Sequence, residues 1–378
     1  MELSEIRSRI DDVDNQLLSL FLERMALSED VAAYKEAHSL PLVNKTRERE
    51  ILAEMTAKAG DKERYVHNLF STLFELSRSR QAELISAPTQ VHDVVTEALS
   101  RSQQVFPKTG LIACQGIEGG NSQAAADHLF PRGNLMFVNS FPAVVAAVES
   151  GLCRFGVLPI ENSANGSVRA VYELLQNHRL SVVRSTRLCI RHELLAKPGT
   201  RLKDVTTIYS HEQALGQCAQ FLEAHKGIQV VPCANTAVAA RQVAESGDPH
   251  AAAIASHSCV ALYGLTCLDD HIQDSDNNYT RFICVTKNPE IYDGSDRISL
   301  IFSCENKPGA LYSMLAKLDA LGINMTKLES CPVTGRAFEF VFFLELEANL
   351  REPGVLAMLE EMERCSETFQ LLGSYSEV

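Results

Sequence analysis

The sequence lacks any apolar run of the length that a membrane-spanning helix requires, which is about 18–20 residues. The first residues, Met1 to Glu5, are acidic and fit a helical pattern, so we do not expect a signal peptide. Basic residues are also fewer than acidic ones, since 35 Lys and Arg stand against 48 Asp and Glu, which gives a formal net charge of −13. This acidic excess argues against nucleic acid and anionic membranes as partners, whereas a local cluster of Arg and Lys could still bind a small anion.

Paired cysteine motifs are also missing. The 11 cysteines form no C-x-x-C pair, and most lie in apolar stretches, as Cys189 and Cys284 do. A cysteine in such a stretch behaves as a small hydrophobic residue. We therefore expect reduced thiols in a cytoplasmic protein and no zinc or other metal site. A chain of 378 residues with 46% hydrophobic residues should form two or three globular domains.

Glycine and proline are absent before Pro41, and apolar residues recur at alternating spacings of three and four from Leu3 to Tyr34. This pattern predicts one long helix with an apolar seam, about 50 Å in length. Arg24 interrupts the seam, and Lys35 projects from nearly the same face. A charge in a seam either sets helix register or binds a ligand. Because three helices of this size bury little alone, we expect pairing with a second copy.

Two more helices should follow, one capped by Asn44 and ending at Gly60, and one over 63–84. Ser77 and Gln81 share a face of the third helix. The segment resembles the all-helical AroQ class of chorismate mutase, an intertwined dimer. The resemblance implies that seven residues bind chorismate: Arg7 (from the partner chain), Arg24, Lys35, Arg47, Glu48, Ser77 and Gln81. We add Asn44 as a binding residue, although the family commonly has Asp there and Asn44 could serve only as a cap. Lys35 and Gln81 would face the ether oxygen, and Glu48 would accept the substrate hydroxyl.

The middle of the chain alternates strand-like and helical runs. Strands are expected at 111–114, 135–138, 155–160, 180–183, 206–209, 229–231, 251–254 and 281–285, and helices at 141–149, 168–177, 211–225 and 236–245. Such alternation predicts parallel or mixed sheets with helices on both faces, in two lobes. The turn at 116–122 is rich in glycine but lacks the G-x-G spacing of a dinucleotide site, so we expect no cofactor.

Four strings occur in the order found in prephenate dehydratase: Gly116 to Ser122, Pro159 to Ser163 with Gly166, Ser210 to Leu215, and Asn278 to Phe282. The resemblance implies a two-lobed fold like that of periplasmic binding proteins. It makes Thr280 the donor to the leaving hydroxyl, and places an anion site at a helix start near Gly166. The residues expected to bind prephenate are Ser122, Glu161, Asn162, Ser163, Gly166, Gln213, Thr280 and Arg281, although Arg281 could instead hold the fold.

The last 80 residues fit a βαββαβ order, with strands at 298–303, after Gly322, at 338–346 and near 369–372, and helices at 310–321 and 355–364. The pattern is ferredoxin-like and resembles an ACT domain. Two strings match the segments that bind phenylalanine in this family. The residues concerned are Asn306, Pro308, Gly309, Ala310 and Leu311 in the first string, and Leu328, Glu329 and Ser330 in the second.

These resemblances predict four regions: a mutase (1–87), a linker (88–108), a dehydratase (109–288) and an ACT domain (295–378). They imply a homodimer or higher homo-oligomer that converts chorismate to prephenate and prephenate to phenylpyruvate, with feedback by phenylalanine. Two alternatives stay open. Only one activity could be retained, since Gly120-Asn121 departs from the dehydratase pattern. Otherwise the chain could be a non-catalytic, amino-acid-sensing protein.

Overall fold

The computed structural model describes residues 2–38, 40, 44–85, 89–101, 105–306, 308–332 and 340–378. It divides into two compact units. The first contains 1–93, 303–322 and 353–368, and the second contains 94–302, 323–352 and 369–378. Parts of the predicted linker and the predicted strand start at Phe338 lie outside the described residues. Each unit is considered by itself below.

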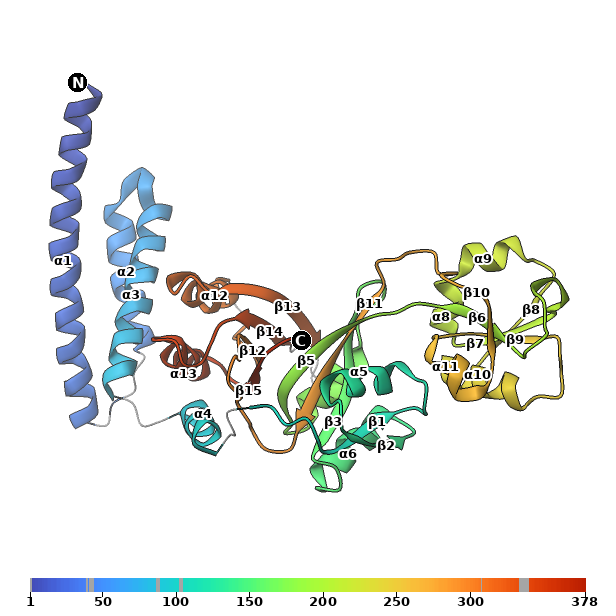
Figure 1. Cartoon of the computed structure of the whole chain (residues 1–378). Coiled ribbons are helices and arrows are strands. Elements are labelled where there is room, and N and C mark those ends of the chain that lie inside the picture. The colour runs from blue at the N-terminus through green and yellow to red at the C-terminus, as the bar shows by residue number, and fades with distance from the viewer. Residues whose placement is uncertain are drawn as a thin grey trace. The chain divides into compact units, whose positions relative to one another are not determined.

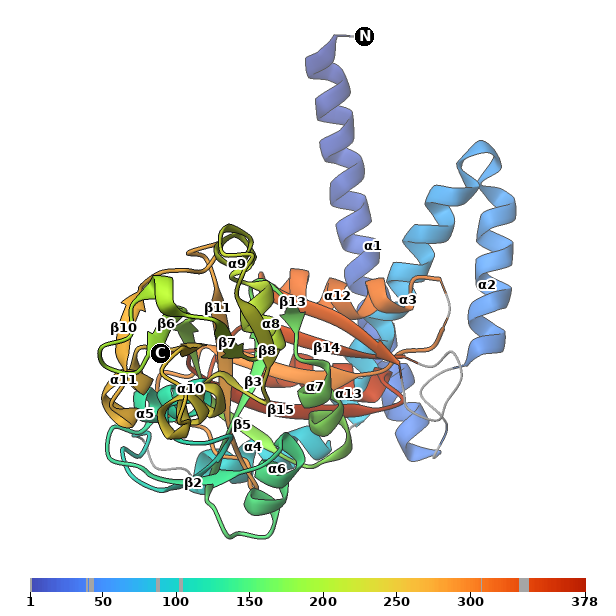
Figure 2. The same ribbon diagram turned by 90° about the vertical axis from the view of Figure 1, so that its right-hand side faces the viewer.

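The first unit is helical. Its elements are α1 (Leu3–Ala37), α2 (Lys45–Lys58), a short 3-10 turn (Gly60–Lys62), α3 (Glu63–Ile85), α12 (Ala310–Ala320) and α13 (Val355–Cys365). The predicted three helices at the N-terminus are confirmed, and the Asn44 side chain accepts a hydrogen bond from the Arg47 amide as a cap. The N-terminal part of α1 extends beyond α2 and α3 (Figures 1 and 2). Its seam residues, Leu3 through Leu20, are therefore exposed.

The second unit contains two mixed α/β lobes. Lobe I is a six-stranded sheet in the order β2-β1-β3-β11-β5, with β4 paired to β3, and lobe II is a five-stranded sheet in the order β10-β6-β9-β7-β8. Lobe I contains β1 (Leu111–Gln115), β2 (Asn134–Val138), β3 (Phe155–Asn162), β4 (Gly166–Ser167), β5 (Ser181–Cys189), β11 (Tyr279–Thr286), α5 (Asn121–Leu129), α6 (Phe141–Glu149) and α7 (Arg169–Asn177). The helix α4 (Gln90–Arg101) precedes it.

Lobe II contains β6 (Glu193–Ala196), β7 (Thr207–Ser210), β8 (Gln229–Pro232), β9 (Ala251–Ala255), β10 (Thr266–Asp269), α8 (Glu212–Gly216), α9 (Ala219–Ala224), α10 (Thr236–Glu245) and α11 (Ser258–Tyr263). The single helix predicted over 211–225 is wrong. It is split because the Asp274 carboxylate accepts hydrogen bonds from the amides of Ala219 and Gln220, both at 3.0 Å, and so starts a new helix.

The second unit also holds a four-stranded antiparallel sheet in the order β13-β14-β12-β15. Its strands are β12 (Arg297–Phe302), β13 (Asn324–Pro332), β14 (Phe340–Glu347) and β15 (Phe369–Tyr375). With α12 and α13 between them in the chain, these strands confirm the predicted ferredoxin-like order. One face of lobe I shares a hydrophobic core with this sheet, in which Ile283 and Val285 of β11 meet Val341 and Phe343.

Candidate active sites

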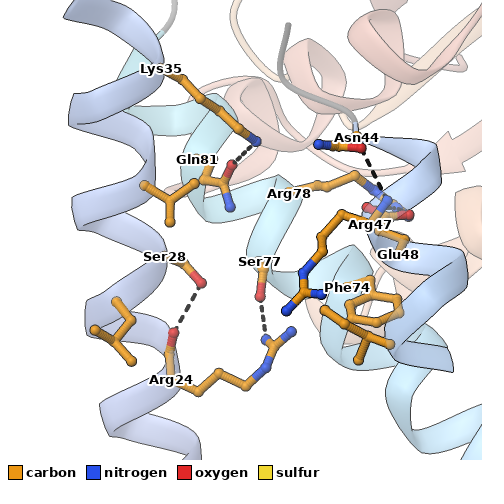
Figure 3. Close-up of a pocket in the computed structure, with 13 residues that line it drawn as sticks. Arg24, Ser28, Lys35, Asn44, Arg47, Glu48, Phe74, Ser77, Arg78 and Gln81 are labelled. Atoms are coloured by element: carbon orange, nitrogen blue, oxygen red, sulfur yellow. Dashed lines mark hydrogen bonds and ion pairs between the residues drawn. The ribbon is translucent and has the colours of Figure 1, made fainter. Parts of the chain in front are cut away.

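The first site is a pocket of about 260 Å³ among α1, α2 and α3, a size suited to a small metabolite. It brings together every residue predicted to bind chorismate except Arg7 (Figure 3). The lining residues with polar side chains are Arg24, Ser28, Lys35, Asn44, Arg47, Glu48, Ser77, Arg78 and Gln81. Helical spacing explains the arrangement, because residues three, four or eleven apart on a helix share a face.

Arg24 is the cation that interrupts the seam of α1. Its Nη1 donates to the Leu73 carbonyl at 3.0 Å and to the Ser77 hydroxyl of α3. Both partners are neutral, so the guanidinium is held in place without being neutralised by them. The Phe74 ring lies 5.7 Å from its central carbon. Partial burial lowers the pKa of Arg24, yet the group stays protonated because arginine titrates far above neutrality.

Lys35 reaches α3 from the C-terminal end of α1. Its Nζ donates to the Gln81 side-chain oxygen at 2.8 Å (Figure 3). Burial lowers the pKa of Lys35, and the Glu48 carboxylate opposes that effect in part. The pocket therefore presents an ammonium and an amide side by side, which can donate to one acceptor oxygen of a ligand.

Helix α2 supplies the acidic side of the pocket. The Glu48 carboxylate accepts from Arg78 Nη1 at 2.8 Å and 2.6 Å, and Arg47 pairs with the exposed Glu50 at 3.4 Å. The sequence interpretation missed Arg78, Phe74 and Ser28. Helical spacing could have identified two of them, since Phe74 and Arg78 lie on the same face of α3 as the predicted residues Ser77 and Gln81.

Arg7 is exposed and lies outside this pocket. It precedes Arg24 by seventeen positions on the same helix, which corresponds to roughly 25 Å along the axis. Arg7 therefore cannot reach the pocket formed by its own α1, and any role for it requires a second chain.

The second set of predicted residues lies where β3 and β11 pair in lobe I. The pairing is antiparallel, with Asn162 opposite Thr280 and Glu161 opposite Arg281. The register shifts by one residue beside these pairs, because Phe282 lies opposite Pro159 and leaves Ile160 as the extra residue of a β-bulge. The strand prediction that ended at Ile160 is therefore wrong: β3 continues through Asn162.

Strand alternation divides the four residues between two faces of the sheet. Asn162 and Thr280 bond to each other on one face, whereas Glu161 and Arg281 bond to the four-stranded sheet on the other. The structure thus does not place all four side chains around one small molecule. Two neutral groups lie on one side and two charged groups on the other.

The neutral face is a network of amides and hydroxyls. The Asn162 Oδ1 accepts the backbone N–H groups of Ala164 and Asn165, both at 3.0 Å. Its Nδ2 donates to Thr280 Oγ1 and Asn278 Oδ1, both at 2.9 Å. An amide nitrogen cannot accept a hydrogen bond, so the Thr280 oxygen is the acceptor in this contact and its own proton is left for another group.

The charged face is dominated by Arg281, which is only 7% exposed. Its Nη1 donates to Glu345 of β14 at 3.0 Å, and its Nη2 contacts Glu345 and the Tyr375 hydroxyl of β15. Burial would lower the pKa of Arg281, but Tyr375 and Glu345 raise it overall. Arg281 is therefore a charged link between β11 and the four-stranded sheet.

Glu161 has a comparable partner on β13. Lys327 Nζ lies 3.0 Å from the Glu161 carboxylate, and it also donates to Ser167 at 2.9 Å. Burial would lower the pKa of Lys327, whereas Tyr172 and Glu161 raise it. The Ser167 hydroxyl in turn donates to Glu329. The predicted dehydratase residue Glu161 and the predicted effector residue Glu329 thus belong to one cluster.

Four other predicted residues have separate surroundings. Ser163 joins β3 to β11, since its hydroxyl donates to the Asn277 carbonyl and accepts the Tyr279 amide, both at 2.9 Å. Ser122 is buried on α5, and Gln213 is exposed on α8. Gly166 belongs to β4 and precedes α7, which begins at Arg169, one residue after the predicted start at 168.

The predicted effector residues fall in both units. Asn306 and 308–311 belong to the first unit, where Gly309 has a φ of 83° and precedes α12. Leu328, Glu329 and Ser330 lie on β13 in the second unit. A positive φ of this size favours glycine, which explains the residue at position 309.

Two family models match separate parts of the chain. Residues 6–82 match the model for chorismate mutase type II, and residues 112–290 match the model for prephenate dehydratase. The bifunctional chorismate mutase/prephenate dehydratase of Escherichia coli (strain K12) is 30% identical over 384 residues, covering 99% of this chain and 96% of that protein.

Solved structures resemble most of the chain. A prephenate dehydratase from Arthrobacter aurescens in complex with L-Phe has a TM-score of 0.64 and 27% sequence identity, and covers 70% of this chain and 89% of that one. A structure described as GqqA, a novel type of quorum quenching acylase, has a TM-score of 0.65 and 31% identity, and covers 71% of this chain and 98% of that one. Within the described residues, no helix has the length and apolar character needed to cross a membrane.

Proposed function

Because the chain belongs to the family of bifunctional chorismate mutases/prephenate dehydratases, we propose that it catalyses two consecutive steps of phenylalanine biosynthesis. The first converts chorismate to prephenate, and the second converts prephenate to phenylpyruvate. The observation that carries the proposal is the helical pocket, in which Arg24, Lys35, Ser77 and Gln81 converge from two helices far apart in sequence.

The mutase reaction is a Claisen rearrangement, in which one C–O bond breaks and one C–C bond forms without proton transfer. Catalysis then consists of holding the dianion in a compact conformer and stabilising charge on the ether oxygen. Arg24 and the Arg7 of the partner chain clamp the carboxylates, with Ser77 and Arg47 assisting. Lys35 and Gln81, joined by their 2.8 Å hydrogen bond, donate to the ether oxygen.

The acidic side of the pocket binds the substrate hydroxyl. Glu48 accepts that hydrogen bond while Arg78 holds its carboxylate in place. Asn44 serves as the cap of α2 and places the Arg47 amide at the rim. These assignments explain why a pocket in an acidic protein is lined by cations, since both carboxylates of chorismate need a partner.

A homodimer completes this part of the proposal. The exposed seam of α1, formed by Leu3, Ile6, Ile10, Val13, Leu17 and Leu20, offers a second copy an apolar surface. Since Arg7 lies on this part of α1 and away from its own pocket, it serves the pocket of the partner chain. The regions at 1–87, 88–108, 109–288 and 295–378 keep their proposed roles as mutase, linker, dehydratase and regulatory domain.

In the dehydratase reaction the bond to the ring carboxylate breaks, its electron pair enters the ring, and the ring hydroxyl leaves. Hydroxide is a poor leaving group, so a donor at that oxygen is required. Thr280 provides it, because its oxygen accepts from Asn162 and its proton is available to the substrate. Accepting one hydrogen bond also strengthens the one that a hydroxyl donates.

The other predicted residues orient Thr280 or bind prephenate beside it. Asn162 orients Thr280, Ser163 fixes the turn beside it, and Ser122, Gln213 and Gly166 contribute to prephenate binding from α5, α8 and β4. Glu161 and Arg281 act indirectly, because both bond to the four-stranded sheet. No cofactor enters either step.

Feedback by phenylalanine is the regulatory part of the proposal. The Arthrobacter relative was solved with L-Phe. In this chain the residues assigned to phenylalanine binding are Asn306, Pro308, Gly309, Ala310 and Leu311 in the first unit, and Leu328, Glu329 and Ser330 in the second. A ligand that binds one arrangement of β13 more tightly than another shifts the conformational equilibrium toward that arrangement. The 11 free cysteines support a cytoplasmic location.

One experiment tests the whole proposal. The purified chain receives chorismate, and prephenate and phenylpyruvate are followed separately, with and without phenylalanine. We expect both products and a fall in phenylpyruvate formation with phenylalanine. Prephenate that accumulates without phenylpyruvate would show that only the mutase is active. Absence of both products would overturn the proposal in favour of a binding or other role.

A further inference from the structure

Two stretches of chain connect the lobes of the second unit, one from β5 to β6 and one from β10 to β11 (Figure 1). They meet at a backbone hydrogen bond of 2.7 Å from the Ile190 amide to the Asn278 carbonyl. His192 follows on the first stretch and Asn278 lies on the second, and both are only 3% exposed. A buried imidazole at this crossing is not used by either reaction as described so far.

A chain of hydrogen bonds joins this imidazole to Thr280. His192 Nε2 lies 2.9 Å from Gln217 Oε1, and Asn278 Nδ2 donates to the same oxygen at 2.9 Å. Asn278 Oδ1 accepts from Asn162 Nδ2, which also donates to Thr280. The connection therefore runs from lobe II, which holds Gln217, to the proposed catalytic hydroxyl in lobe I.

The direction of every bond in this chain is determined at one end. The backbone amides of Ala164 and Asn165 can only donate, so the atom of Asn162 that they contact is its oxygen. Its nitrogen then faces Asn278 and Thr280, which turns the Asn278 oxygen toward Asn162 and the Asn278 nitrogen toward Gln217.

The orientation of the Gln217 amide then determines the tautomer of His192. The Asn278 nitrogen donates, so the Gln217 atom that it contacts is the amide oxygen. This oxygen carries no hydrogen, so it also acts as an acceptor toward His192. Nε2 of His192 must therefore carry the proton. Among the described residues Nδ1 has no partner, and it is the nitrogen left without a hydrogen, so no buried N–H is unpaired. Burial lowers the pKa of His192, which favours this neutral form.

We propose that His192 is a positioning residue of the dehydratase, acting as the Nε2–H tautomer that closes the chain through Gln217 and Asn278 and holds the Asn162 amide on Thr280. In this arrangement the Thr280 proton faces the substrate. Without the His192 donor, the Gln217 amide can rotate, and an NH₂ group turned toward Asn278 would oppose the Asn278 donor and disturb Asn162. The inference rests on the proposed function of Thr280.

The test compares His192→Leu, which removes the donor, with His192→Gln, whose amide nitrogen can replace Nε2. We expect His192→Leu to lower the kcat for prephenate about tenfold, the effect of one buried hydrogen bond, with little change in KM. His192→Gln should recover most of this loss. Turnover of chorismate by the same samples gives the concentration of active chain, because its pocket lies in the other unit, and thermal unfolding of each variant reports on folding of the unit that contains His192. Unchanged kcat in His192→Leu, or equal loss in both folded variants, would overturn the proposal.

A spectroscopic measurement covers the case in which His192→Leu does not fold. Nitrogen NMR of the full chain with labelled histidine distinguishes the two tautomers, and His192→Gln assigns the signal by its disappearance. We expect a neutral ring protonated at Nε2, and a ring protonated at Nδ1 would contradict the proposal. Failure of the proposed function and failure of the His192 proposal give different results. If wild-type chain fails to convert prephenate, the proposed function fails, whereas normal conversion with unaffected His192 variants rejects the positioning role alone.

Discussion

The mutase pocket and the dehydratase residues use charge in opposite ways. In the pocket, the cations Arg24 and Lys35 line the cavity and donate to the Ser77 hydroxyl and the Gln81 amide oxygen. At the junction of β3 and β11, the charged residues Glu161 and Arg281 face oppositely charged groups of the four-stranded sheet. The groups turned to the other side of that junction are neutral.

The difference follows from what each reaction needs. A rearrangement of a dianion gains from cations that are positioned in advance. Loss of a hydroxyl gains from a directed hydrogen-bond donor, and a neutral threonine oriented by an amide can supply it. Glu161 and Arg281 thus connect β3 and β11 to the four-stranded sheet, although they neighbour the proposed catalytic residues Asn162 and Thr280 in sequence.

The largest effect is expected for Arg24→Ala in the pocket. Loss of a positioned donor to a carboxylate should lower mutase kcat/KM by roughly 100–1,000-fold, and turnover of added prephenate should stay unchanged. Arg24→Lys is the matched control, since it keeps the charge but loses the guanidinium geometry, and it should retain part of the activity. Equal loss of both activities in Arg24→Ala would show that the two sites are not independent.

Thr280→Val should have the converse effect. Removing the donor to the leaving hydroxyl should lower dehydratase kcat by about 100-fold while the mutase stays active. Thr280→Ser keeps the hydroxyl and should preserve most of the rate. A fully active Thr280→Val variant, measured as phenylpyruvate formed from prephenate, would show that the donor has been assigned to the wrong residue.

Arg281→Met examines the charged face. It leaves Glu345 buried beside one fewer cation, so unfolding should occur at a lower temperature and dehydratase kcat should fall about tenfold. The double variant Arg281→Met/Glu345→Met removes both charges and should regain most of the thermal stability. If Arg281 instead holds a carboxylate of prephenate, KM should rise sharply and the double variant should not recover.

The smallest effect concerns pH. Because burial lowers the pKa of Lys35, its ammonium should deprotonate at a lower pH than that of an ordinary lysine. The protonated form is the one that donates to the ether oxygen, so mutase activity should fall as the pH rises through that value. Lys35→Arg should shift this alkaline decline upward, and an identical pH profile would exclude Lys35 as the titrating group. The dehydratase, measured in parallel, should not follow the same curve.

Much of this architecture could be predicted from local sequence. Helices with clear N-caps were placed correctly: α6 begins after Ser140 and α10 after Asn235, whose side chains accept hydrogen bonds from the first turn. The residues that the resemblance assigned to chorismate, apart from Arg7, line one pocket of α1 to α3, and helical spacing explains why these side chains share a face. Arg78 could have been included by the same rule.

The missed features depend on contacts between distant segments. Strands β6 and β10 are only four residues long, so they show little alternation before they pair. The break between α8 and α9 requires Asp274, which is about fifty residues further along the chain. The partners of Arg281 are Glu345 of β14, Tyr375 of β15 and Glu377 beyond β15, and nothing in the local string Asn278 to Phe282 indicates them.

The bulge at Ile160 has a consequence for how this region can change. One extra residue in β3 places Glu161 on the same side as Arg281, and Asn162 on the same side as Thr280. If Ile160 were instead paired regularly opposite Arg281, Glu161 would lie opposite Thr280 and Asn162 opposite Tyr279, so that a carboxylate would meet Thr280. The bulge therefore determines which side chain of β3 meets the Thr280 hydroxyl.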